Sequence, residues 1–347
     1  MAYTDIDKPS DYFNTNLWTG TGSIQSITGV NFQPDWLWVK TRSTTANHRS
    51  QNSVIGAEYG MNPNQTVAEG FLSDCVTSFD SDGFTLGADS QGYVNTSSRT
   101  YVGWSWLASN TTASNTVGDI NSTVSVNTTS GFSIGTYTGN GTAGATIGHG
   151  LASDKVTIIV KRTDTTSNWG VKHYKIPATQ WLQLDQNDGA NTSSLIWNDT
   201  EPTSSVFSVG SYVGTNASGG TYVFYAFAEK KGFSKFGSYT GNGNADGTFV
   251  YTGFKPAFVL VKRTDTAGYE WSIWDNKRDP FNLADTTLRP NSSASESTIG
   301  SFYQIDMLSQ GYKFRTSNGD VNDSGGTYIY MAFAEEPLVG DNPATAR

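Results

Sequence analysis

The sequence predicts an all-β protein built from three tandem β-sandwich modules of the jelly-roll or concanavalin-like kind, each of about 100 residues. Three observations support this. Gly, Ser, Thr, Asn and aromatic residues are abundant, and only 15% of residues are charged. Aromatic and β-branched residues favour strands, whereas Gly and Asn favour tight turns. No segment combines helical periodicity with capping signals, and several sequence blocks recur three times in the same order.

The internal repeat is the strongest of these observations. A T-G-x-G turn occurs at 19–22, 138–141 and 240–243, and a hydrophobic run ending in basic residues follows at 36–42, 156–162 and 257–263. Each unit then closes with a polar turn and a second hydrophobic run, which starts at Thr100, Thr221 or Thr327. A period of about 100 residues is too long for solenoids, which repeat every 20–50 residues or so, and matches a complete small β domain.

These blocks predict the domain boundaries. The predicted division is an N-terminal segment (1–10), a first β-sandwich (11–108), a linker (109–130), a second β-sandwich (131–229), a third β-sandwich (232–335) and a C-terminal tail (336–347). The linker is predicted because that stretch is rich in Ser, Thr and Asn. Within the units, the run TYIYMAFAE is apolar on both faces, which predicts a central strand buried on both sides.

Charge, cysteine content and hydropathy argue against nucleic-acid binding, disulfide bonds and membrane insertion. The formal net charge of −9 and the pI near 4.8 argue against nucleic acid, because phosphate binding needs a basic face. Cys75 is the only cysteine, so no internal disulfide is possible, and folding in a reducing cytoplasm is expected. The N-terminus lacks the features of a signal peptide, and no apolar run approaches the ~20 residues that span a bilayer. We therefore expect a protein made soluble in a cytoplasm, without membrane insertion.

Short motifs that resemble catalytic or metal sites lack the context that such sites need. Residues 131–135 fit G-x-S-x-G, but a strand-like segment follows instead of the required helix. His48, His149 and His173 show no ligand spacing, and the calcium-loop-like start at 80–83 lacks its closing glutamate. We expect no catalytic residue, no metal and no cofactor.

Basic residues recur at the exit of one predicted strand in each unit, as Lys40/Arg42, Lys161/Arg162 and Lys262/Arg263. Such charges prevent edge-to-edge strand pairing or form salt bridges between modules. Alternatively, they form a row that recognises an acidic surface sugar, if the modules stack in a line.

Tryptophans provide the candidate ligand-binding residues, because a sugar ring stacks well on an exposed aromatic ring. Trp169 and Trp271 align with each other, and Trp274 follows closely, whereas Trp181 and Trp197 have no counterpart in the other units. The alternative is that these rings pack in the core, where large aromatic side chains bury much area.

The blocks YTGNG, GFKPAFVLVKRTD and NGDVNDSGGTYIYMAFAE, with SFDSDGFTLG and VNTSSRTYVGWSW in the first unit, resemble a repeated domain of unknown function. That domain is common in phages of marine and aquatic bacteria, including cyanophages. The resemblance extends from about Leu17 to Glu335. It implies a concanavalin-like sandwich and a role as a virion structural or tail-fibre-like protein, and it carries no catalytic residues.

From this resemblance we expect a non-enzymatic phage particle protein, associated with the tail, that contacts host surface polysaccharide. Its expected partners are other virion proteins and its own copies, with a homotrimer favoured, and its expected location is the virion, released by lysis. No heptad segment is available for trimerisation, so module faces must form any oligomer. A capsid decoration protein is one alternative. A polysaccharide-degrading enzyme is another, and it would need two carboxylates about 5–10 Å apart in a groove.

Overall fold

The computed structural model describes residues 4–297, 302–337 and 343–344. The prediction of an all-β fold is confirmed, because these residues form antiparallel sheets with only two α-helices of four residues each. The strands group into three pairs of sheets along the chain. We call these pairs the first (13–106), second (113–228) and third (234–337) modules.

The first module follows a short 3-10 helix, η1 (Pro9–Asp11). Its large sheet has the order β1-β9-β3-β4-β5-β6, and its small sheet has the order β2-β8-β7. The strands are β1 (Phe13–Thr19), β2 (Gln25–Thr28), β3 (Trp36–Thr41), β4 (Arg49–Asn52), β5 (Gly56–Met61), β6 (Gly70–Phe71), β7 (Val76–Asp80), β8 (Gly83–Leu86) and β9 (Thr100–Trp106).

The second module has a large sheet of order β10-β11-β12-β19-β14-β15-β16-β17 and a small sheet of β13 and β18. Its elements are β10 (Ala113–Asn115), β11 (Ser122–Asn127), β12 (Phe132–Thr138), β13 (Ala145–Gly148), β14 (Val156–Arg162), β15 (Trp169–Lys172), β16 (Gln180–Gln183), β17 (Asn191–Thr192), α1 (Ser194–Trp197), β18 (Val206–Val209), α2 (Val213–Asn216) and β19 (Thr221–Ala228).

The third module has a large sheet of order β20-β26-β22-β23 and a small sheet of order β21-β25-β24. The strands are β20 (Ser234–Thr240), β21 (Phe249–Tyr251), β22 (Phe254–Arg263), β23 (Ser272–Asp275), β24 (Ile305–Leu308), β25 (Gly311–Phe314) and β26 (Thr327–Pro337).

The large sheets share one topology and one register. In each, the strand that ends at the T-G-x-G threonine (β1, β12 or β20), which we call the opening strand, pairs with the last strand, and the last strand pairs with the strand that carries the basic residues (β3, β14 or β22). The opening strand meets the closing threonine at the same place in all three: Thr19 opposite Thr100, Thr138 opposite Thr221, and Thr240 opposite Thr327. The sequence blocks that recur along the chain are therefore structurally equivalent.

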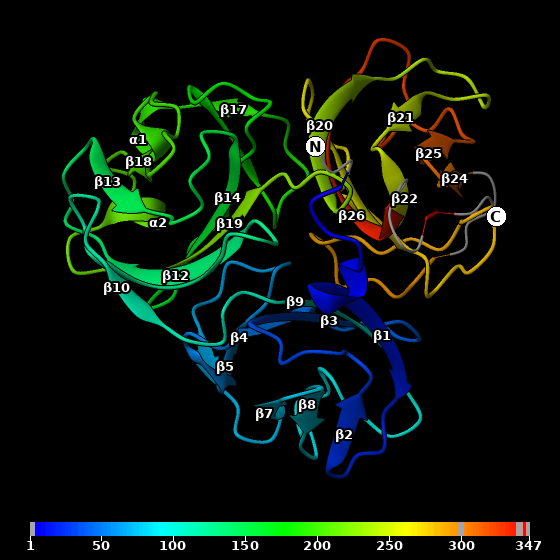
Figure 1. Ribbon diagram of the computed structural model, residues 1–347, viewed down its shortest axis with the longest axis horizontal. Coiled ribbons are helices and arrows are strands. Elements are labelled where there is room, and N and C mark those ends of the chain that lie inside the picture. Colours follow the sequence, from blue (N-terminus) through cyan, green and yellow to red (C-terminus); the bar gives the residue numbers. More distant parts are fainter. Residues whose placement is uncertain (1–3, 298–301, 338–342, 345–347) are drawn as a thin grey trace.

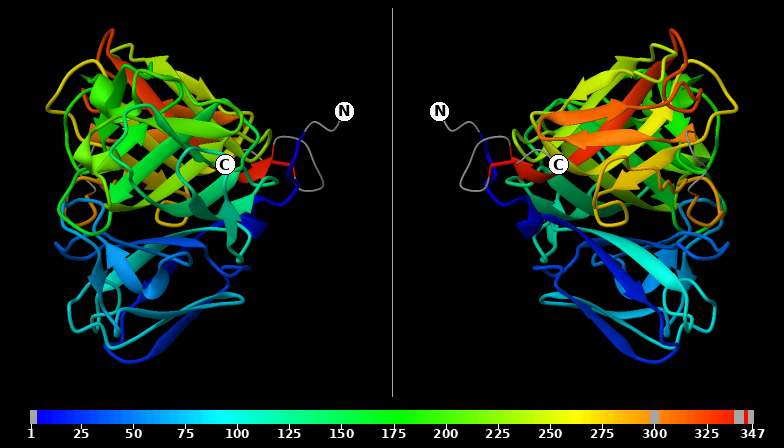
Figure 2. Two further views of the ribbon diagram at one scale, coloured as in Figure 1. Left: turned by 90° about the vertical axis from the view of Figure 1, so that its left-hand side faces the viewer. Right: turned by 90° about the vertical axis from the view of Figure 1, so that its right-hand side faces the viewer.

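The three modules are arranged as a triangle, with their large sheets turned toward the centre (Figure 1). The side views show the first module below the other two (Figure 2). The start of β1 lies beside the end of β26, because the Phe13 and Phe333 rings stack at 5.2 Å. The chain thus closes on itself, with the third module against the first.

One hydrophobic cluster, which we call the central core, fills the middle of this triangle. It contains side chains from all three large sheets, among them Trp36, Trp106, Tyr225, Phe227 and Phe333. Successive residues on a strand point to opposite faces, so the alternate residues fill a separate core between the two sheets of each module. The closing strand β26 is buried on both faces, as its sequence predicted.

The segment 109–130 differs from the predicted linker. It forms β10 and β11, and β11 pairs with β12 from Ser122 to Asn127. The buried carboxylate of Asp35 holds its start, because it accepts hydrogen bonds from the Ala108 and Asn110 amides and from the Ser125 hydroxyl. The polar residues that predicted a linker are thus used in a strand and in a hydrogen-bond network.

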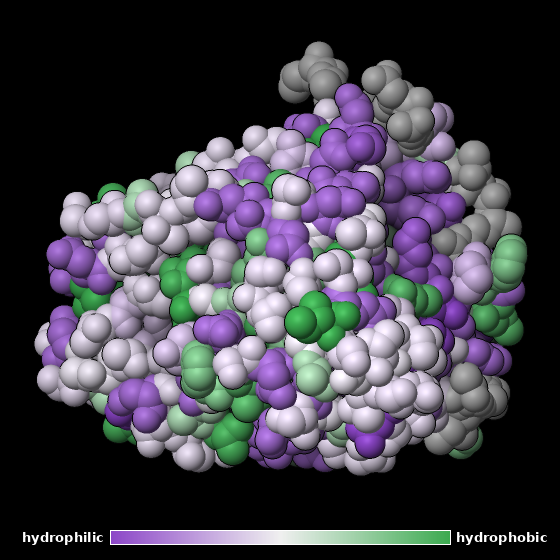
Figure 3. Space-filling model, turned by 90° about the horizontal axis from the view of Figure 1, so that it is seen from below, coloured by the Kyte–Doolittle hydropathy of each residue, from purple (hydrophilic) through white to green (hydrophobic). Residues whose placement is uncertain are grey.

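On the face that Figure 3 shows, hydrophobic residues form small separate patches between hydrophilic ones. Scattered patches of this kind are usual on protein surfaces and do not by themselves mark a docking site.

Candidate functional site

The lysines at the strand exits lie at the contacts between modules and do not form a row on the surface. Lys40, Lys161 and Lys262 are fully buried. Each Nζ donates to one carbonyl of its own module and to one of a neighbouring module: Lys40 to Thr41 and Ser293, Lys161 to Ser167 and Thr66, and Lys262 to Tyr269 and Asn187. A lysine of the first module thus bonds to the third module, a lysine of the second bonds to the first, and a lysine of the third bonds to the second.

Burial changes the protonation of these lysines. Loss of solvation lowers the pKa of Lys40 to about 7 and the pKa of Lys161 and Lys262 to about 8. A neutral amine still donates to two carbonyl oxygens, so the hydrogen bonds persist above those pH values.

A second contact recurs at the same three interfaces. His48 and Trp271 directly precede β4 and β23, and Trp169 is the first residue of the equivalent strand β15. Their ring nitrogens bond to a carbonyl of the neighbouring module: His48 Nε2 to Arg289 at 2.9 Å, Trp169 Nε1 to Asn62 at 3.2 Å, and Trp271 Nε1 to Gln183 at 2.9 Å. We call these three equivalent contacts the ring interfaces. Head-to-tail contacts of this kind form a closed ring when the rotation between units allows it.

The five tryptophans predicted to stack on a sugar are all in the protein interior. Their exposed fractions are 0% for Trp169, 2% for Trp271, 0% for Trp274, 8% for Trp181 and 1% for Trp197. The prediction that they form a binding platform is therefore wrong, since a covered ring face cannot stack on a ligand. Trp169 and Trp271 serve the ring interfaces, and the other three pack inside their own modules.

The arginines of the basic groups form ion pairs. Arg42 of the first module binds Glu296 of the third through Nε at 2.6 Å and Nη2 at 3.0 Å, so the predicted salt bridge between modules occurs here. Arg162 and Arg263 pair with Asp164 and Asp265, two residues ahead of each. The alternative of a row for acidic sugars does not fit, because the modules form a triangle and the lysines are buried.

The repeated turns also serve the scaffold. Asn95, Asn216 and Asn322 are fully buried in the segments that precede the three last strands of the large sheets, β9, β19 and β26. Asn216 Oδ1 accepts from the Asn140 and Gly141 amides, and its Nδ2 donates to the Thr142 and Gly210 carbonyls. A Cβ at Gly139, in the same T-G-x-G turn, would come within 2.5 Å of the Ala217 carbonyl oxygen, so glycine is required there.

The residues that resemble reactive sites in the sequence are likewise buried or hydrogen-bonded within the protein. The carboxylate of Asp82 accepts from the Gly29 and Asn31 amides, so it closes a turn. Ser133, in the G-x-S-x-G match, is fully buried within β12. Burial raises the pKa of the Cys75 thiol to about 12. Within the described parts of the chain, no group of three or more His, Cys, Asp or Glu side chains is placed to hold a metal ion.

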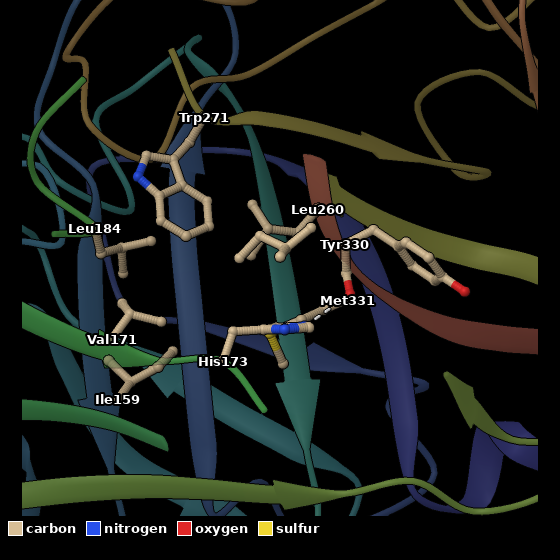
Figure 4. A pocket seen from close by; sticks show the side chains of 9 residues that line it. Ile159, Val171, His173, Leu184, Leu260, Trp271, Tyr330 and Met331 are labelled. Atoms are coloured by element: carbon tan, nitrogen blue, oxygen red, sulfur yellow. Dashed lines mark hydrogen bonds between the residues drawn. The ribbon is translucent and has the colours of Figure 1, made fainter. Parts of the chain in front are cut away.

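An internal cavity lies where the second and third modules meet in the central core (Figure 4). Apolar side chains such as Val171 and Leu260 line it with His173, whose Nε2 bonds to the Tyr330 carbonyl at 3.1 Å. The Tyr330 ring points away from the cavity (Figure 4). The cavity has a volume of about 10 Å³, which accommodates at most one water molecule, so it cannot serve as a ligand site.

A larger hollow opens where the third module meets the first. Two adjoining cavities of about 510 and 60 Å³ share Asn276, Lys277 and Glu335. We call them together the closure groove. Phe281, which is 78% exposed, lines the larger cavity, and the residues around Phe13 line the smaller one.

The closure groove exists because this junction departs from the symmetry of the other two. Asn276 occupies the position of Ser53 in the first module and Tyr174 in the second, one residue after β23 or β4 and two residues after β15. Ser53 Oγ donates to Asp35 at 2.5 Å, and the Tyr174 hydroxyl bonds to Glu229 and to the Phe236 carbonyl. Asn276 makes no side-chain hydrogen bond to any described residue, and its Oδ1 is fully buried.

Two comparisons gave no relatives: no curated protein and no solved structure matches the chain. Among the described residues, no helix is long and apolar enough to cross a bilayer. A family model described as "Domain of unknown function (DUF7483)" matches residues 8–337. This match includes all three modules, so the chain belongs to that family.

Proposed function

We propose that this chain is a non-enzymatic structural protein of a bacteriophage particle, associated with the tail and in contact with host surface polysaccharide. The observation that supports this most is the closed ring, in which the repeated lysines, aromatic residues and asparagines all stabilise the scaffold. A rigid body of this kind suits a particle component that must keep its shape outside a cell. The resemblance of its sequence blocks to a phage domain supports the same role.

The predicted homotrimer stays a prediction, and the fold restricts how it can form. The inward faces of the large sheets are already buried in the central core of a single chain. Any contact between copies, or with other virion proteins, must therefore use the outer faces of the modules.

Particles purified after lysis provide the test. We expect mass spectrometry to detect the chain in the particle, and an antibody against it to label the tail in electron micrographs. Labelling on the icosahedral lattice would instead support capsid decoration, and absence from purified particles would contradict the proposal. Release of new reducing ends from host polysaccharide by the purified chain would contradict its non-enzymatic part.

A further inference from the structure

We propose that the closure groove is a carbohydrate-binding site, which takes a hexose unit of a surface polysaccharide between Phe281, Asn276 and Lys277. This inference rests on the proposed function, because it places the contact with host polysaccharide in one groove of the third module.

The size and lining of the groove suit such a ligand. Small-molecule sites are concave, with volumes of about 300–1,000 Å³, and combine apolar walls with a few polar groups. The larger cavity of about 510 Å³ is in this range. A sugar ring has an apolar C–H face that stacks on an aromatic ring, and Phe281 is the most exposed aromatic side chain lining it.

Polar side chains line the groove beside the exposed Phe281 ring. Asn276 is 4% exposed, lines both cavities, and has an amide without a hydrogen-bond partner among the described residues. Buried polar groups are normally hydrogen-bonded, so a ligand hydroxyl group at the groove would complete the hydrogen bonding of this amide. Lys277 is exposed at the same groove and has no ion-pair partner among the residues described.

An ion pair completes the lining. Lys255 Nζ lies 3.1 Å from Glu335 and 3.6 Å from Glu336, and Lys255 and Glu335 both line the larger cavity. A paired ammonium and carboxylate offer one donor and one acceptor without strong net charge, which matches hydroxyl groups that both donate and accept. In the other two modules the equivalent side chains, Ser53 and Tyr174, are hydrogen-bonded within the protein, whereas Asn276 makes no such bond among the described residues.

The test uses the full chain on an array of neutral and uronic-acid oligosaccharides, followed by calorimetry with the best-bound oligosaccharide. We expect Phe281→Ala and Asn276→Ala each to weaken binding by about ten-fold or more. The matched control is Phe71→Ala, which removes another exposed aromatic ring in the first module. It should bind as the unchanged chain does.

Unfolding temperatures separate a binding role from a structural one. Because the Asn276 amide has no hydrogen-bond partner among the residues that the structure describes, Asn276→Ala should leave the unfolding temperature unchanged or raise it. A clear fall would assign Asn276 to the scaffold and overturn the proposal, as would retained binding in both variants or no bound saccharide on the array. Such a failure leaves the particle role intact, because detection of the chain in purified particles tests that role independently.

Discussion

At the scale of single residues, the ring interfaces use side chains that are costly to bury. A lysine in a protein interior loses its hydration, and only well-placed acceptors offset that cost. Lys40, Lys161 and Lys262 each find two carbonyl oxygens, one of which belongs to another module. The stability of the assembly should therefore depend on the protonation of these amines.

Lys161→Met should remove part of the pH dependence of unfolding. Burial lowers the pKa of Lys161 to about 8, so the folded chain releases this proton while the unfolded chain keeps it to about pH 10.5. Between these values the unfolded state binds more protons, so the free energy of unfolding rises with pH, by at most about 1.4 kcal/mol per pH unit. Below about pH 8 both states are protonated and this slope vanishes. Urea unfolding across this range should give a smaller slope for the variant; equal slopes would contradict the prediction.

Trp36→Ala should lower the free energy of unfolding by about 3–5 kcal/mol, because it opens a cavity where the modules meet. The Trp36 ring is 2% exposed and lies 4.4 Å from the Trp106 ring and 4.5 Å from the Tyr225 ring of the second module. Chemical denaturation measures the loss. Phe71→Ala is the control, since its exposed ring should contribute less than about 0.5 kcal/mol. A similar small effect for both variants would mean that the central core contributes little.

At the scale of elements, the segment 109–130 shows how a polar stretch becomes ordered. Asp35→Ala removes the carboxylate that accepts the Ala108 and Asn110 amides and the Ser125 hydroxyl. We expect the chain before β11 to become open to protease while the modules stay folded. Limited proteolysis with mass spectrometry should find new cleavage at about 108–121. Cleavage spread evenly over the chain would indicate global unfolding and contradict a local role for Asp35.

The strands themselves were predictable, because apolar runs and Asn/Gly turns determine them locally. The double burial of β26 was also visible in TYIYMAFAE, since a strand apolar on both faces must be covered on both sides. What covers each face was not visible. The burial of Lys161 depends on Thr66, far along the chain, and the burial of Trp197 depends on the packing of α1 within the second module. The sequence did not predict the closure groove, because the groove depends on a single position. At position 276 the side chain makes no hydrogen bond to a described residue, whereas Ser53 and Tyr174 at the equivalent positions do.

At the scale of the whole molecule, the three modules behave as parts of a single body. The central core joins side chains of all three large sheets, and three ring interfaces close the triangle. A module that lacked its neighbours would expose the inward face of its large sheet, and a continuous apolar face of this size favours association or misfolding.

The second module alone, residues 109–229, should therefore not be a folded monomer. Ile159, Tyr225 and Phe227 are buried in the full chain against other modules and would face solvent in the fragment. The ring interfaces are head-to-tail and equivalent, so copies of one module can satisfy them, and we expect a trimer or an aggregate. Light scattering after size-exclusion chromatography measures the mass, with the full chain as control. A stable monomeric fragment with native unfolding behaviour would show that the modules are independent and that the central core is dispensable.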